Sequence, residues 1–288
     1  MTENIFLAII GGSGLYSMTG LTDTQEYDIE TPFGKPSAPI VVGSLEGKRL
    51  AFLARHGIGH HIMPTEVPYR ANIYALKALG AERIVSINAC GSLREEYAPG
   101  HIVIPDQLFD NTKGRSRTFF GEGMVAHTGV ADPFCPDLSA DLEESVQQTG
   151  AIVHHGGAFI IIEGPRFSTK AESNTFRSWG MSIIGMTAAP EAFLAREAEM
   201  CYAVMAHVTD YDVWHVNEAP VTVEMVIKIL NQNTVIAQQA VRNLVKSLKP
   251  ERSCDCVNAM ATALITNPAV IPTETRKKLD LFVRKYLK

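Results

Sequence analysis

"CYAVMAHVTDYDVWH", residues 201–215, is the stretch that decides the fold. Its first half is almost wholly apolar and has the length of one fully buried strand, which is typical of a sheet covered by helices on both faces. Asp210 and Asp212 follow at once, with Tyr211 between them. Carboxylates at the end of a buried strand are costly unless something binds them, so this strand end is a candidate ligand site.

Short apolar runs alternate with helix-like segments along the rest of the chain. The expected strands are residues 6–10, 39–43, 49–54, 83–89, 101–105, 158–162, 181–186 and 201–208. The expected helices are residues 69–80, 139–150, 169–180, 189–200, 222–248 and 273–287. This alternation predicts an α/β fold with a largely buried central sheet. Residues 106–136 lack periodicity, which is typical of a functional loop or an interface.

Composition favours one globular domain over residues 1–288 and excludes several partners. The 288 residues carry a net charge of −5, so no basic field attracts a nucleic acid or an anionic membrane. No apolar run reaches the roughly 18–20 residues of a membrane span, and the first residues lack a basic leader pattern. We therefore expect a cytoplasmic protein. The five cysteines form no C-x-x-C pair and no zinc spacing, so no metal site is expected.

Four turns at expected strand ends carry groups that suit an anion. They hold Ser13 in "IIGGSGLY", Arg55 and His56 in "LARHGIGHHIMP", Asn88 and Ala89 in "INACGSLREE", and Thr187 in "GMTAAPE". Backbone amides in glycine-rich turns, a guanidinium fork and a helix start all favour phosphate. Each turn alone is also explained by tight chain reversal or by exposed loop histidines. An NAD site is disfavoured, because the first turn lacks G-x-G-x-x-G.

Two further stretches suit a flat heterocycle. Phe167, in the loop "IIEGPRFSTKAES", offers a ring for stacking. A purine presents an acceptor at N7 and an amino donor at N6, so Asp210 and Asp212 match it if one acid is protonated. From spacing alone, a helix cap with a solvated turn remains an alternative for the acid pair.

Taken together, these motifs resemble the trimeric purine nucleoside phosphorylase family. The motifs that carry the resemblance span about residues 6 to 250 and are "GGSGLY", "TPFGKPSAPIVVG", "LARHG" with "YRANIYALK", "ACGSLRE", "IEGPRFSTKAES", "GMTAAPEAFLAREA" and "TDYDVW". The resemblance implies one α/β domain with a mixed, partly barrelled sheet surrounded by helices. It also implies a homotrimer, and residues from about 251 would be a C-terminal helical extension.

The resemblance also assigns roles to single residues. The implied phosphate site is Ser13, Arg55, His56, Asn88, Ala89 and Thr187. Met186 would lie under the ribose, Phe167 against the base, and Asp210, Tyr211 and Asp212 along the purine, with Asp210 and Asp212 catalytic. His127 would contact the 5′ end of the substrate that is bound by a neighbouring subunit. Ser13 and Asn88 stand where the family often has Thr, which puts the geometry at Asn88 in question.

Three positions imply the substrate within that family. Members that act on 6-oxopurines carry Asn at the position of Asp210, and guanine-type members carry Glu at the position of Ser168. Val223 is apolar where those enzymes place a His for a 5′-hydroxyl, so a methylthio group is favoured. The implied reaction is phosphorolysis of 5′-methylthioadenosine to adenine and 5-methylthioribose 1-phosphate, with phosphate as co-substrate and no cofactor or metal.

Other functions remain open at this point. The nearest are a phosphorylase for adenosine or methylthioinosine and a water-using nucleosidase; an NAD-binding oxidoreductase and a non-catalytic nucleoside-binding protein are more distant. Disulfide bridges in heat-stable relatives imply that Cys135 and Cys201 lie close enough to pair, with Cys254 and Cys256 as a second pair.

Overall fold

The computed structural model describes residues 3–12, 18–215 and 223–287. Its strands are β1 (Leu7–Gly11), β2 (Thr22–Tyr27), β3 (Ile40–Leu45), β4 (Lys48–Ala54), β5 (Arg83–Ser92), β6 (Ile102–Ile104), β7 (Gln107–Asn111), β8 (Val153–His155), β9 (Ala158–Ile162), β10 (Ile183–Gly185) and β11 (Cys201–Asp210). Its helices are α1 (Tyr69–Ala78), α2 (Pro136–Gln147), α3 (Lys170–Ser178), α4 (Ala188–Glu197), α5 (Val223–Ser247) and α6 (Thr273–Val283), with the 3₁₀ turns η2 (Asp255–Asn258) and η3 (Pro268–Val270).

All eleven strands belong to one mixed sheet that branches at β5. The main path runs β2-β3-β4-β1-β5-β10-β9-β7, while β11 pairs with β5 and continues to β6 and β8. β5 is parallel to β1 and β11 and antiparallel to β10. The predicted α/β class and mixed central sheet are confirmed, and β5 with β11 forms the middle of the molecule.

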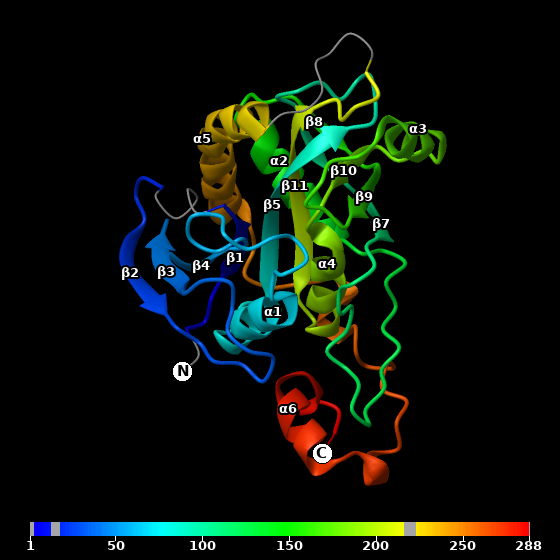
Figure 1. Cartoon of the computed structure of the whole chain (residues 1–288). Coiled ribbons are helices and arrows are strands. Elements are labelled where there is room, and N and C mark those ends of the chain that lie inside the picture. Colours follow the sequence, from blue (N-terminus) through cyan, green and yellow to red (C-terminus); the bar gives the residue numbers. More distant parts are fainter. Residues whose placement is uncertain (1–2, 13–17, 216–222, 288) are drawn as a thin grey trace.

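The strand β11 shows why both faces of the sheet are apolar. Tyr202 and Val204 belong to the core that includes residues of α1 and α4. Cys201 and Ala203 belong to a second core, with residues of α2 and α5. Successive side chains of a strand point to opposite faces, so one apolar run supplies two cores. Figure 1 shows the same layering, with the helices on both sides of β5 and β11.

Three strands are absent from the sequence-based expectation. β2 reads TDTQEY and is exposed at every position except Tyr27, because it pairs on one side only, with β3. β7, QLFDN, lies inside residues 106–136 and pairs with β9. β8 is three residues long. Short or polar edge strands lack the apolar alternation by which strands are recognised, so the expectation missed them.

The C-terminal residues pack against the irregular part of the 106–136 segment. Ala126 forms a β-bridge with Leu264, and the rings of Phe119 and Phe282 stand 4.3 Å apart. In Figure 1 these two segments, with α6, form a projection at the end of the molecule away from the carboxyl end of β11. Among the described residues, no helix is long and apolar enough to cross a membrane.

Candidate active site

Asp210 and Asp212 lie together at the carboxyl end of β11. The pairing of β11 with β5 shifts register between Val208 and Asp210. Asp210 Oδ1 accepts the backbone N–H of Asp212 at 2.7 Å, and its Oδ2 lies 2.6 Å from the Thr209 hydroxyl. Asp212 has a positive φ of 50°, a conformation that Asp tolerates better than most residues. The turn thus holds both carboxyls at one strand end.

Burial changes the proton affinity of both acids. Burial, helped by the neighbouring charge of Asp212 and opposed by the hydrogen bonds from Thr209 and from the Asp212 backbone N–H, raises the pKa of Asp210 to about 6. Burial also raises the pKa of Asp212. Removing a carboxylate from water disfavours the charged form. A partly protonated Asp210 can therefore act as a proton donor close to neutral pH.

Polar atoms beside the acid pair are buried and unpaired. Within the described ranges, Asp212 Oδ2 and the hydroxyls of Ser168 and Ser173 have no hydrogen-bond partner. Both hydroxyls approach Asp212 closely enough to favour its ionised form without completing a normal hydrogen bond. Unpaired buried polar atoms are rare in folded proteins and point to a polar ligand at this place.

A glycine of β5 makes room for the acid pair. A Cβ atom on Gly91 would lie 3.0 Å from Asp210 Oδ1 and 3.0 Å from Ile184 Cγ2. Both separations are shorter than ordinary van der Waals contact, so a side chain here would push Asp210 aside. The sequence "ACGS", expected to be a turn, is the end of β5, and its glycine allows the acid pair to pack closely against the strand.

A second set of site residues forms a continuous hydrogen-bonded chain. Arg55 Nε and Nη2 hold the two carboxylate oxygens of Glu191, each at 2.9 Å. The Ser86 hydroxyl donates to Glu191 at 2.7 Å and accepts from Asn88 Nδ2 at 3.0 Å. The Thr187 hydroxyl then donates to Asn88 Oδ1 at 2.7 Å. The network joins the residue after β4, the strand β5, the helix α4 and the turn before α4.

Almost all N–H groups of Arg55 donate to residues of this network. Arg55 is 3% exposed, and besides Glu191 it donates to Ile87 O and Ser86 Oγ. Since a guanidinium has five N–H groups, about one N–H, on Nη1, remains for an anion. Arg55 can therefore act on phosphate mainly by holding Glu191, Ser86 and Asn88 in place.

His56 is arranged as an acceptor. Its Nδ1 lies 2.9 Å from Ile62 O, so the carbonyl oxygen accepts and Nδ1 carries the hydrogen. Burial, with the charge of Arg55, lowers the pKa of His56 to about 4. The ring is therefore neutral at pH 7, and its Nε2 can accept the P–OH hydrogen of monohydrogen phosphate.

The two sets lie near the same end of β5. Asn88 and Gly91 are three residues apart on β5, and Gly91 is the β5 partner of Asp210. Three strand residues span about 10 Å. A ligand with an anion at one end and a heterocycle at the other fits this separation.

Several other predicted residues border the site. Met186 and Thr187 follow β10 directly, and Ala89 lies between Asn88 and Gly91 on β5. A Cβ on Gly164 would lie 2.6 Å from Met186 Sδ, so the Phe167 loop passes close to Met186. Phe167 is 39% exposed, which leaves a ring face free for stacking.

Two predicted residues, Tyr211 and His127, lie apart from these two sets. The Tyr211 hydroxyl donates to Glu95 O, and its ring stacks on His215. His127 lies in the projection, exposed, with its backbone N–H on Ala263 O. Ser13 and the side chain of Val223 lie outside the described residues.

Sequence reasoning missed three residues that organise the site. Glu191 ends the quoted stretch "GMTAAPE", and Ser86 lies in the expected strand 83–89. The available signal was an acid and a hydroxyl among apolar residues. Arg115, from the irregular segment, is 6% exposed and donates to Met186 O at 2.6 Å and Ala189 O at 2.7 Å. It fixes the turn that carries Thr187.

The buried hydrogen-bonded network around Arg55 and Glu191 lies near a buried acid pair on a mixed α/β sheet, an arrangement that suits an enzyme acting on a polar heterocycle with an anion. The chain matches the phosphorylase superfamily over residues 6–246, and it belongs to that family.

Proteins that are similar in sequence and proteins that are similar in structure carry the same name. The S-methyl-5′-thioadenosine phosphorylase of Geobacter sulfurreducens is 55% identical, covering 98% of this chain and 99% of its own. That of Thermofilum pendens is 50% identical, covering 91% of this chain and 100% of its own. A crystal structure of methylthioadenosine phosphorylase from an antarctic soil metagenomic library has a TM-score of 0.93 and 46% identity, covering 98% and 99%. A Schistosoma mansoni methylthioadenosine phosphorylase in complex with adenine has a TM-score of 0.83 and 36% identity, covering 89% and 96%.

Proposed function

We propose that this protein cleaves the N-glycosidic bond of 5′-methylthioadenosine with inorganic phosphate, giving adenine and 5-methylthioribose 1-phosphate. The observation that carries the proposal is the buried acid pair, with Asp212 Oδ2 unpaired and the pKa of Asp210 raised to about 6. A protonated Asp210 can donate to purine N7 while Asp212 accepts from the N6 amino group. The named activity of the relatives, and adenine in one of their structures, support it.

The reaction balances with the groups present. A phosphate oxygen attacks C1′ while the bond from C1′ to N9 breaks, and its electron pair moves into the purine. The proton that Asp210 gives to N7 stabilises the leaving adenine. Monohydrogen phosphate loses one proton in forming the ester, and neutral His56 Nε2 can accept it. The phosphate charge also stabilises the ribosyl cation that develops in the transition state.

The phosphate end of the site is proposed to be Asn88, Thr187, His56 and the backbone of Ala89, with Ser13 from the first turn. The Thr187 hydroxyl donates its one hydrogen to Asn88 Oδ1 at 2.7 Å, so it would turn from Asn88 to donate to a phosphate oxygen. Asn88 keeps one N–H after bonding to Ser86. Phosphate needs no metal or organic cofactor in this arrangement.

We further propose a homotrimer, in which His127 reaches the site of a neighbouring subunit. The projection that carries His127 also exposes apolar side chains, including Val125 at 47% and Ile265 at 61%. Exposed apolar groups gathered on one projection are typical of an interface. Sedimentation equilibrium should give about three times the 31.5 kDa chain mass; an active monomer would contradict this.

The five unpaired thiols favour a reducing compartment such as the cytoplasm.

One substrate panel tests the proposed activity. Adenine release from methylthioadenosine should require phosphate and yield one sugar phosphate for each adenine. Release at the full rate without phosphate would establish a nucleosidase instead. Adenosine and methylthioinosine, assayed beside it, separate the nearest alternative phosphorylases.

A further inference from the structure

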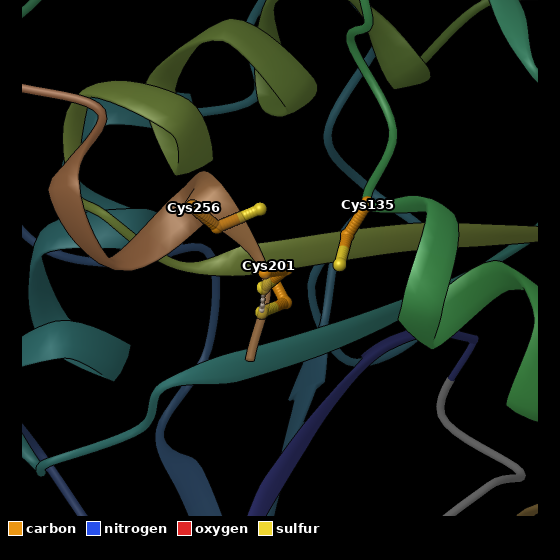
Figure 2. A group of neighbouring side chains, drawn as sticks. Cys135, Cys201 and Cys256 are labelled. Carbon is orange, nitrogen blue, oxygen red and sulfur yellow. Dashed lines mark hydrogen bonds between the residues drawn. The ribbon is translucent and has the colours of Figure 1, made fainter. Parts of the chain in front are cut away.

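Four of the five cysteines meet at the amino end of β11. Cys135 directly precedes α2, Cys201 begins β11, and Cys254 and Cys256 lie at η2. Their sulfur atoms all lie within 4.8 Å of one another, and Cys201 Sγ is 3.3 Å from Cys254 Sγ. Figure 2 shows the side chains of Cys135, Cys201 and Cys256 arriving from these separate segments. Cys135 and Cys201 are neighbours, as expected, within a larger cluster.

The cluster is remote from the candidate active site. Cys201 and Asp210 are the first and last residues of β11. A strand of this length spans about 30 Å, so neither phosphate nor purine chemistry accounts for the sulfur atoms. Three of the four cysteines are buried, and Cys254 is partly buried.

The sulfur positions match the demands of one tetrahedral ion. Zinc in a four-cysteine site has Zn–S bonds of about 2.3 Å, which place the sulfur atoms roughly 3.8 Å apart. All the sulfur–sulfur distances lie within 4.8 Å, which allows that separation, and the 3.3 Å between Cys201 Sγ and Cys254 Sγ would lengthen by about half an ångström on binding. No metal site was expected from the sequence, because the ligands come from three separate segments, with a C-x-C pair in place of C-x-x-C. Only the folded chain brings them together.

The charges around the cluster suit a thiolate site. One zinc ion and four thiolates carry a net double negative charge. Arg196 Nη1 donates to Cys256 Sγ at 3.3 Å, and Arg252 Nη1 lies 4.0 Å from Cys201 Sγ. Within the described residues, the buried Nε of Arg196 has no other partner. Cationic donors to sulfur are the kind of outer contact that stabilises a metal centre.

We propose that Cys135, Cys201, Cys254 and Cys256 bind one Zn²⁺ ion as a closed structural site. Binding releases four thiol protons to solvent and leaves no open position for water or substrate, so the ion takes no part in the reaction. It joins the residues after α5 to the base of the central strand. A cavity of about 310 Å³ borders Cys135, Cys201 and Cys254 and offers an entry route.

Disulfide bridges are the competing use of the same thiols. A bridge would consume the cysteines two at a time and would need an oxidant, whereas one zinc ion uses all four in their reduced state. The two chemistries differ in the number of titratable thiols and in metal content. The test therefore measures both in the same sample.

The experiment uses untagged full-length protein, purified under a reducing agent after growth in zinc-containing medium. Elemental analysis should find about one zinc per chain, and a mercurial thiol reagent should release it in step with four thiols. Cobalt substituted for zinc should give the charge-transfer and d–d absorption of a tetrahedral thiolate site. These readouts are independent of catalysis, so failure of the zinc site and failure of the proposed reaction are distinguishable.

Matched variants test which residues bind the ion. Cys254→Ser, at the least buried ligand, should lose the zinc, while Cys90→Ser, outside the cluster, should retain it. Arg196→Gln should weaken zinc affinity by about 10- to 100-fold, as is typical for an outer contact. Protein without metal, whether its four thiols are free or bridged, overturns the proposal. One iron per chain overturns the assignment to zinc.

Discussion

The Thr187 hydroxyl donates to Asn88 Oδ1 at 2.7 Å, joining the turn before α4 to the centre of β5. Because Asn88 Nδ2 is also held by Ser86, its side chain has one orientation in this network. These two hydrogen bonds orient the Asn88 side chain. Its contact with phosphate remains a prediction.

Asn88→Ala should weaken phosphate binding. It removes an amide donor and leaves the Thr187 hydroxyl without its acceptor, so the phosphate KM should rise about 3- to 10-fold, the range for one neutral hydrogen bond. Initial rates against phosphate at saturating nucleoside measure this, with the nucleoside KM as internal control. A rise in the nucleoside KM alone would place Asn88 elsewhere in the site.

Glu191→Gln should destabilise the fold. Glu191 is fully buried, and its carboxylate accepts from Arg55, Ser86 and Tyr202. Removing one charge of a buried pair leaves the other uncompensated, at a cost of about 3–5 kcal/mol. Urea unfolding without phosphate measures the loss. Glu274→Gln, which breaks the exposed pair with Lys277, is the control and should change stability by about 1 kcal/mol or less. Equal effects of the two variants would refute the structural role of Glu191.

The activity should depend on the protonation of Asp210. Its pKa is raised to about 6, so the acid form is complete well below that pH and is lost as pH rises through it. At saturating phosphate, kcat/KM for the nucleoside should therefore fall above about pH 6, approaching tenfold per unit, and bound phosphate can move the midpoint upward. Asp210→Asn should abolish this limb. An unchanged limb in the variant would assign it to another group.

The same shift predicts a pH dependence of stability. Since the folded pKa of Asp210 lies above its ordinary value of 3.8, ionisation costs more in the folded protein than in the unfolded chain. Stability from this group is therefore complete below about pH 4 and declines as pH rises towards 6. Thermal unfolding of the wild type and Asp210→Asn over this range should show a smaller decline in the variant. Parallel curves would count against the shifted pKa.

Gly91→Ala should impair the acid pair without weakening phosphate binding. The added Cβ would lie 3.0 Å from Asp210 Oδ1, and displacement of a catalytic group by even about 1 Å costs on the order of a hundredfold in rate. The expected result is a lower kcat with an unchanged phosphate KM. Wild-type kcat in a folded Gly91→Ala protein would show that Asp210 tolerates the shift.

The long apolar strands and the amphipathic helices were predictable from the sequence. The apolar residues of β11 and β5, for example, themselves indicate that these strands are buried. Edge strands such as β2 were not, since their pairing depends on a neighbour rather than on an apolar pattern. At the site, the strand-end position of Asp210 was visible in the sequence. The hydrogen-bonded ion pair of Glu191 with Arg55 was not visible, because the two residues are 136 positions apart in the sequence. The four-cysteine cluster shows the same limit, because its spacing exists only in the folded chain.

The central claim, that Asp210 and Asp212 read and protonate a 6-aminopurine, is tested most directly by Asp210→Asn. Asn donates a hydrogen bond to a 6-oxo group and cannot supply the carboxylic proton. The measurement is kcat/KM for methylthioadenosine and for methylthioinosine in wild type and variant, at saturating phosphate. We predict that the ratio moves towards methylthioinosine by roughly ten- to a hundredfold, equivalent to about 1–3 kcal/mol for one mismatched buried polar group. An unchanged ratio would contradict the account, because Asp210 would then not recognise the 6-position of the purine.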